Sequence, residues 1–297
     1  MSDGDRGWFP MFVVLSAIWG ASFLFIKVGD RAFAPLQVAF GRCALGAITL
    51  LALAAVRRER LPRTRAAWAH LFVIAVLFNS VPFALFAWGE TRVSSVVAGI
   101  WNATTPLNAL LVALAVLPKE RPNRDRVLGL LVGFAGVLVV LGPWTGLGGR
   151  LLGNLACFGA AACYGIGFPY TRRFLAGRPE SAVALSAAQV LCGALQLALV
   201  VPWLTSAPHR FPLDSVLSMI ALGAGGTGIA YVLNLAVIRR AGATVASTVT
   251  YLIPLFSTIL GVGVLGEALS WNQPVGAAVV LAGVALSQGR LSRPRRE

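Results

Sequence analysis

The sequence predicts an all-α integral membrane protein whose ten transmembrane helices form two inverted five-helix repeats. Three observations predict this class: the composition, ten apolar runs of spanning length, and an internal repeat whose loop charges alternate. Of the 297 residues, 57% are apolar and 12% are charged, whereas a soluble domain carries about 25% charged residues. The chain therefore has too little polar surface to cover a soluble globule.

A helix of about 20 apolar residues crosses a hydrocarbon core about 30 Å thick. The predicted spans are 9–28, 34–56, 66–88, 93–117, 127–141, 151–171, 182–204, 213–238, 243–265 and 269–288. Their connections are too short for a soluble domain. The first run follows a short acidic leader and has no small-residue cleavage site after it, so we expect it to stay as a span.

The net charge of +14 follows the connections in alternation. The N-terminus, the even-numbered connections and the C-terminal tail hold 19 of the 25 Lys and Arg residues. This alternation is the positive-inside pattern and predicts that both termini are cytoplasmic. Only Lys27 and Lys119 among the basic residues are lysines, and this bias, with abundant Ala and Gly, indicates a GC-rich bacterial genome and hence a bacterial inner membrane. A nucleic-acid-binding protein would gather its charge on one folded patch, so we expect the lipid bilayer, and no nucleic acid, as partner.

The two halves of the chain repeat each other. Pro106 and Pro254 lie 148 positions apart, and "VAGIWNATTPLNALLVALAVL" lies over "VASTVTYLIPLFSTILGVGVL" at that offset. The repeats are predicted at 9–141 and 151–288, followed by a basic tail at 289–297. Because each repeat holds five helices, an odd number, the second enters the membrane upside down. Inverted repeats of this kind are typical of alternating-access transporters with a binding site near the midplane.

The chain resembles the drug/metabolite transporter superfamily, specifically its ten-helix proteins with two EamA-type repeats. The resemblance rests on an ordered set of residues in duplicate: Trp19-Gly20, Arg42, Pro106 with Glu120, Pro254 with Glu267, Gly129 with Gly136, and Gly276 with Gly283. It implies export of small metabolites, often amino acids, with drugs, nucleotide-sugars or sugar phosphates as alternative substrates in other branches.

Prolines and glutamates in the repeated motif are candidate hinge or gating residues. Pro106 and Pro254 are expected near the middle of the fourth and ninth helices, where each produces a kink for packing or a kink that moves during transport. Glu120 and Glu267 each precede the next helix, so we expect each to cap the positive end of that helix rather than form a gating ion pair. Arg42 either holds a substrate carboxylate or, as long basic side chains near span ends usually do, extends outward to Asp30 or Glu267.

Aromatic and amide side chains within the spans predict an uncharged site for amphipathic zwitterions or small aromatic molecules. Polyanionic phosphates normally require arginine or lysine side chains, which these positions lack. Polar residues in spans also join helices without binding a ligand, and this alternative remains for each candidate. The candidates are Trp19, Asn79, Phe83, Trp101, Asn102, Thr105, Asn108, Tyr164, Thr227, Tyr231, Asn234 and Tyr251.

The acidic residues bear on energy coupling. All 11 Asp and Glu residues fall at termini, span ends or loops, whereas proton-coupled carriers usually place an ionisable group within the membrane. We therefore expect facilitated transport or exchange rather than tight coupling to protons. A polytopic membrane enzyme is the alternative from another class, but paired acids, a histidine cluster and a P-loop are missing from the sequence. No cofactor or metal is expected, and the four cysteines are interpreted as small apolar residues of the spans.

Overall fold

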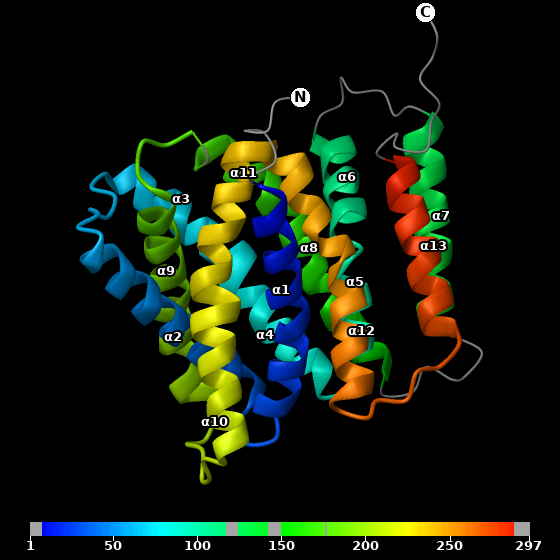
Figure 1. Ribbon diagram of the computed structural model, residues 1–297, viewed down its shortest axis with the longest axis horizontal. Coiled ribbons are helices and arrows are strands. Elements are labelled where there is room, and N and C mark those ends of the chain that lie inside the picture. Colours follow the sequence, from blue (N-terminus) through cyan, green and yellow to red (C-terminus); the bar gives the residue numbers. More distant parts are fainter. Residues whose placement is uncertain (1–7, 117–123, 142–149, 176, 288–297) are drawn as a thin grey trace, which may run out of the picture.

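The computed structural model describes residues 8–116, 124–141, 150–175 and 177–287, and in this part of the chain every regular element is helical (Figure 1). The first half contains α1 (Phe9–Gly29), α2 (Pro35–Val56), α3 (Arg65–Ala75), η2 (Val76–Ser80), α4 (Val81–Glu90), α5 (Ser95–Asn102), α6 (Thr105–Val116) and α7 (Arg124–Leu141). The second half contains α8 (Arg150–Phe174), α9 (Ala182–Leu204), α10 (Leu213–Ile220), η4 (Ala221–Ile229), α11 (Ala230–Ser247), η5 (Thr248–Tyr251), α12 (Ile253–Gly263) and α13 (Asn272–Ser287).

Six helical segments of the described chain are long and apolar enough to cross a membrane. They are Phe9–Gly29, Pro35–Val56, Arg65–Glu90, Arg150–Thr171, Ala182–Leu204 and Leu213–Arg240, with shorter apolar helices at Val127–Val140 and Val249–Gly263. These segments coincide with predicted runs, except that α11 continues to Ser247, beyond the predicted end at 238. The arginines and alanines that follow 238 favour helix, so no helix-breaking residue stops α11 there.

A π-helical turn interrupts the third span and the eighth span at corresponding positions. In the third span η2 lies between α3 and α4 and ends two residues before Pro82, whose missing N–H would leave a gap in a regular α-helix. In the eighth span η4 lies between α10 and α11 and contains four glycines in nine residues. Asn79 in η2 and Thr227 in η4 are 148 positions apart, so the irregularity belongs to the repeat.

The two repeated prolines lie at breaks between helices. Pro106 is the second residue of α6, after a turn at Ala103 and Thr104, and Pro254 is the second residue of α12, after the 3₁₀ turn η5. Each proline therefore occupies the first turn of a new helix, where its missing N–H costs no hydrogen bond. The predicted kinks in continuous helices are in fact breaks that divide each span into two helices.

The contacts of α1 and α8 show that these helices run in opposite directions. Lys27, in the last turn of α1, donates hydrogen bonds to the carbonyls of Glu90 and Val93, where α4 passes into α5. Gly153, in the first turn of α8, packs against Arg92 and Val93 of the same connection. The end of α1 and the beginning of α8 thus lie at the same end of the bundle, as an inverted repeat requires.

Glycines allow close contact between α7 and α13, which lie side by side at one edge of the bundle (Figure 1). A Cβ atom at Gly136 would lie 2.6 Å from the backbone nitrogen of Val280, and one at Gly283 would lie 2.3 Å from that of Gly133. Only glycine permits this approach of the two backbones. The repeated glycines therefore hold together the last helix of each half.

Candidate functional site

A central cavity lies where the broken and interrupted spans of both halves meet. It is lined by Trp19, Ser22, Phe23, Ile26, Arg42, Phe78, Phe83, Phe86, Asn102, Tyr164, Phe168, Tyr231 and Thr250. Its volume is about 40 Å³, room for a few water molecules at about 10–15 Å³ each, so an organic substrate fits only after the walls move apart. The structure therefore shows the site in a contracted form.

The lining residues come in pairs related by the repeat. Four such pairs face the cavity: Trp19 with Tyr164, Phe23 with Phe168, Phe83 with Tyr231, and Asn102 with Thr250. Trp19 and Tyr231 meet edge to face, with ring centroids 6.3 Å apart. Because each half contributes the same positions, the cavity lies on the axis that relates the two halves.

Arg42 brings a charge into this wall. Its side chain is only 6% exposed, its Nε donates to Thr227 Oγ1 over 2.8 Å, and its Nη2 donates to the Gly226 carbonyl over 3.3 Å. The guanidinium also lies 3.7 Å from the ring centroid of Phe83, an arrangement that favours a cation. The expectation that Arg42 extends outward to Asp30 or Glu267 is wrong, because the interrupted helix η4 offers it a carbonyl and a hydroxyl inside the bundle. The expectation of an uncharged site is also wrong, because Arg42 lines the cavity.

A second buried network occupies the corresponding place in the other half. Gln189 Nε2 donates to Asn79 Oδ1 over 3.0 Å, and Asn79 Nδ2 donates to the Tyr231 hydroxyl over 3.0 Å. The Tyr231 hydroxyl in turn donates to the Phe78 carbonyl over 2.8 Å. These bonds hold Tyr231 in one orientation at the cavity wall.

The predicted site residues divide into three groups. Trp19, Phe83, Asn102, Tyr164 and Tyr231 line the central cavity, together with Arg42. Asn79 and Thr227 lie behind the wall and orient Tyr231 and Arg42.

The other candidates lie elsewhere. Trp101 donates to Asn154 Oδ1 over 2.7 Å and, with Asn108, lines a separate apolar pocket beside α7 and α8. Thr105 donates to Asn102 Oδ1 over 3.3 Å, and Tyr251 packs beside Leu107 and Val280. Asn234 lines a separate small pocket that shares Phe78 and Tyr231 with the central cavity.

Four phenylalanines of the cavity wall were not among the predicted site residues: Phe23, Phe78, Phe86 and Phe168. Phenylalanine in a span is ordinary lipid-facing or core material, so its type alone gives no signal. The repeat does give one for two of them, because Phe23 and Phe168 follow Trp19 and Tyr164 at the same spacing of four.

Glu267 caps a helix, though a different one from the helix expected. Its Oε1 accepts from the Ser95 amide over 2.9 Å, and its Oε2 accepts from the Ser95 hydroxyl over 2.8 Å and the Val96 amide over 3.2 Å. The carboxylate therefore caps α5 of the first half, not α13, which follows it in the chain. The positive helix end and three donors stabilise its charge. Glu120, its counterpart, lies outside the described residues.

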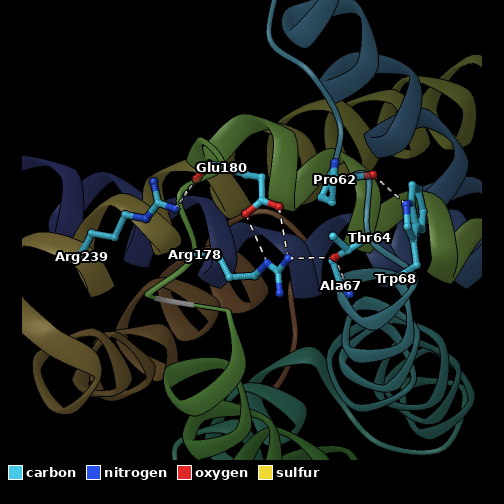
Figure 2. A network of polar contacts seen from close by, with 7 residues as sticks. All are labelled: Pro62, Thr64, Ala67, Trp68, Arg178, Glu180 and Arg239. Carbon is cyan, nitrogen blue, oxygen red and sulfur yellow. Dashed lines mark hydrogen bonds and ion pairs between the residues drawn. The ribbon is translucent and has the colours of Figure 1, made fainter.

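At the opposite end of the bundle, polar contacts join the two halves (Figure 2). Arg178 donates to both carboxylate oxygens of Glu180, over 3.2 and 3.3 Å, and to Thr64 Oγ1 over 3.3 Å. Arg239 donates to the Glu180 carbonyl over 2.6 Å. The hydrogen bond from Arg178 lowers the pKa of Glu180. We call Thr64, Arg178, Glu180 and Arg239 the inner latch, because they connect the start of α3, the α8–α9 connection and α11 at the end predicted to face the cytoplasm.

Comparisons with known proteins agree with this architecture. The EamA-like transporter family matches the chain twice, at residues 7–142 and 151–288. The inner membrane transporter YedA of Escherichia coli K12 is 28% identical over 93% of this chain and 90% of its own. PagO of Salmonella typhimurium is 24% identical over 93% of this chain and 91% of its own.

Two further likenesses extend over the same length. A transporter of Archaeoglobus fulgidus is 25% identical over 92% of this chain and 94% of its own. A solved crystal structure with 24% identity superposes with a TM-score of 0.70 over 97% of this chain and 100% of the other, which shows the shared fold. With the family matched in both halves, the chain belongs to the EamA-like transporter family and is a membrane transporter.

Proposed function

We propose that the protein exports amino acids, aromatic or otherwise neutral, or closely related small metabolites, by alternating access at the central cavity. One observation carries this proposal: a buried arginine lies in a wall otherwise built from aromatic rings, amides and hydroxyls. Arginine binds a carboxylate through two parallel hydrogen bonds, and the surrounding rings suit an apolar side chain. This lining matches the two ends of a zwitterion.

The other substrates of the superfamily fit less well. Among the described residues that line the cavity, Arg42 is the one with a charged side chain. A sugar phosphate or a nucleotide-sugar carries two or more negative charges, which normally require several cationic side chains. A cationic drug would meet the repulsion of Arg42. The membership in a transporter family also argues against the alternative of a membrane enzyme.

The assignment of the inner and outer ends rests on the loop charges. The excess of Lys and Arg at the N-terminus, the even-numbered connections and the tail favours cytoplasmic termini in a bacterial inner membrane. The inner latch is then cytoplasmic, and the cap of Glu267 on α5 faces outward. Transport requires these two ends to open in turn around the cavity.

We further propose that transport is facilitated. Arg42 is the charged group of the cavity, and the described carboxylates lie toward the ends of the bundle. In proteoliposomes, substrate should then approach equal concentrations on both sides. Coupling to one proton would instead raise the accumulation ratio about tenfold for each pH unit, since one unit is worth about 1.4 kcal/mol.

The experiment is a flux panel in proteoliposomes. Radiolabelled phenylalanine, threonine, glucose 6-phosphate and an amphipathic cationic drug are each tested for counterflow and for steady-state accumulation under an imposed pH gradient. We expect counterflow of an amino acid without accumulation. Counterflow of the phosphate or the drug alone would overturn the substrate class, and a ratio near ten that collapses with a protonophore would overturn facilitation.

A further inference from the structure

A pair of acidic side chains is buried at the outer end of the bundle, away from the central cavity. Glu90, the last residue of α4, is fully buried, and no described residue donates a hydrogen bond to either of its carboxyl oxygens. Both carboxyl oxygens of Asp30, just after α1, are buried and equally without a described donor. A buried carboxylate without donors is costly, so such groups normally take up a proton.

The charged groups around Glu90 are balanced when the two acids share one proton. Two charged groups that act on it come from the end of α1: Lys27 in its last turn and Asp30 just after it. The others are Arg42 of α2 and Glu267 of the α12–α13 connection. The Cys157 thiol of α8 faces the same region. Arg42 is engaged by Thr227 and Glu267 by the start of α5. Lys27 remains as the single cation beside two acids, and one added proton makes this group of three neutral.

The second half has no acidic residue at the positions equivalent to Glu90 and Asp30. The counterparts of Glu90 and Asp30 are Ile238 and Leu175, at offsets of 148 and 145 residues. Both counterparts line the small pocket that leads from Tyr231 toward the inner end. The acid pair therefore occupies the corresponding place toward the outer end of the bundle. Ionisable side chains stand there in place of the apolar side chains of the inner end.

From this juxtaposition we propose that Glu90 and Asp30 form a proton-binding site that keeps the outer end closed while it holds its proton. Loss of the proton leaves a net negative charge in a dry site, which drives hydration and opening of the outer end. The pair lies at one end of the bundle, with the contracted cavity and the inner latch between it and the other end. Protons therefore enter and leave from the outside, so they control opening without driving transport.

The sign of the pH dependence follows from burial. Burial raises the pKa of Asp30 to about 8 in the closed form, whereas a hydrated aspartate titrates near its ordinary value of 3.8. Between these values the closed form holds a proton that the open form has lost. Closing is therefore favoured by low external pH, and the ratio of closed to open molecules falls up to about tenfold per pH unit as external pH rises toward 8.

The first test needs no substrate. Infrared difference spectroscopy of the protein in lipid vesicles should detect the carbonyl stretch of a protonated carboxyl group at neutral pH, and the band should disappear as pH rises through about 8. Glu90→Gln and Asp30→Asn should each remove or shift this band. Asp214→Asn is the matched control, because Asp214 is exposed at the same end and ion-paired with Arg31. Absence of the band at neutral pH, or an unchanged band in both variants, would overturn the proposal.

The second test measures gating and rests on the proposed function only for its probe. Exchange of labelled phenylalanine should accelerate as external pH rises from 5 to 8, whereas internal pH should have no such effect. Glu90→Gln should remove the external dependence, and Asp214→Asn should retain it. An equal response to internal pH would overturn access from the outside. If phenylalanine is not exchanged while the infrared band behaves as expected, the substrate proposal fails and the proton site stands.

Discussion

Arg42 and Gln189 occupy equivalent positions in the two repeats, and each donates a hydrogen bond to the π-helical turn of the opposite half. Arg42 Nε donates to Thr227 Oγ1 over 2.8 Å, and Gln189 Nε2 donates to Asn79 Oδ1 over 3.0 Å. The two hydrogen bonds are equivalent in the two halves, but Arg42 carries a positive charge and Gln189 carries none. The cavity is therefore symmetric in shape and asymmetric in electrostatics, which gives a zwitterion one orientation in which to bind.

Tyr231 and Trp101 should respond differently to alanine substitution, because only Tyr231 lines the cavity. Tyr231→Ala removes ring area from the wall and should weaken substrate affinity about tenfold, as the loss of a stacking contact of about 1–1.5 kcal/mol implies. Trp101→Ala should lower stability and leave affinity within about twofold. Affinity is read from competition in proteoliposomes and stability from thermal unfolding in detergent. Equal losses of affinity in both variants would place substrate in the pocket beside α7.

Glu267→Gln should destabilise the protein by about 1–2 kcal/mol, because it removes the charge that faces the start of α5 and replaces one acceptor oxygen with a donor. Thermal unfolding in detergent measures the loss. Asp214→Asn, which alters an exposed carboxylate of the same end, serves as the control and should change stability little. An unchanged melting temperature in Glu267→Gln would show that the cap contributes nothing.

The inner latch should loosen in Glu180→Gln and in acid, because the Glu180 carboxylate orients the Arg178 guanidinium that donates to Thr64 of the first half. The pKa of Glu180 is lowered in the latched form by the hydrogen bond from Arg178, so its ionic contacts persist at neutral pH and are lost as pH falls through that lowered value. Distances between spin labels on the α2–α3 and α8–α9 connections report the opening. We expect longer distances in Glu180→Gln at neutral pH and in the parent protein only in acid. Identical distances at neutral pH in both proteins would rule out a latch.

The loop charges predict the topology, which labelling can test. An impermeant thiol reagent added outside intact cells should fail to label a cysteine at Arg60 and should label one at Ala207. Both positions are exposed at opposite ends of the bundle, so access alone decides the outcome. Labelling at Arg60 and protection at Ala207 would reverse the orientation and exchange the assigned inner and outer ends.

The sequence predicts the helical membrane fold because composition and run length report directly on burial in lipid. It also identifies half of the cavity wall through paired positions such as Trp19 and Tyr164. The sequence does not predict where the Arg42 side chain lies, because its partner is the Gly226 carbonyl in the π-helical turn η4. Hydrophobic periodicity does not detect such a turn. Glu267 shows the same limit, since its partner Ser95 is 172 residues away in the chain. Contacts between halves arise from tertiary packing that neither half encodes alone.

The burial of Glu90 is the clearest case of a residue whose interpretation changes in three dimensions. In the sequence it stands at the end of a span, next to loop residues, and nothing marks it as buried. In the structure α1, α5 and α8 converge on the end of α4 and enclose it completely. Position along a span therefore does not predict exposure where four helix ends meet.

The central claim is that Arg42 binds the carboxylate of the transported molecule. The most direct measurement compares Arg42→Gln, which gives the first half the residue of its counterpart Gln189, with the parent protein in competition by phenylalanine and by phenethylamine, which lacks the carboxylate. A hydrogen bond to a charged group is worth about 1.5–3 kcal/mol, so phenylalanine should lose about ten- to hundredfold in affinity while phenethylamine loses nothing or gains. Equal affinity of both proteins for phenylalanine, or a parallel loss for both ligands, would contradict the account.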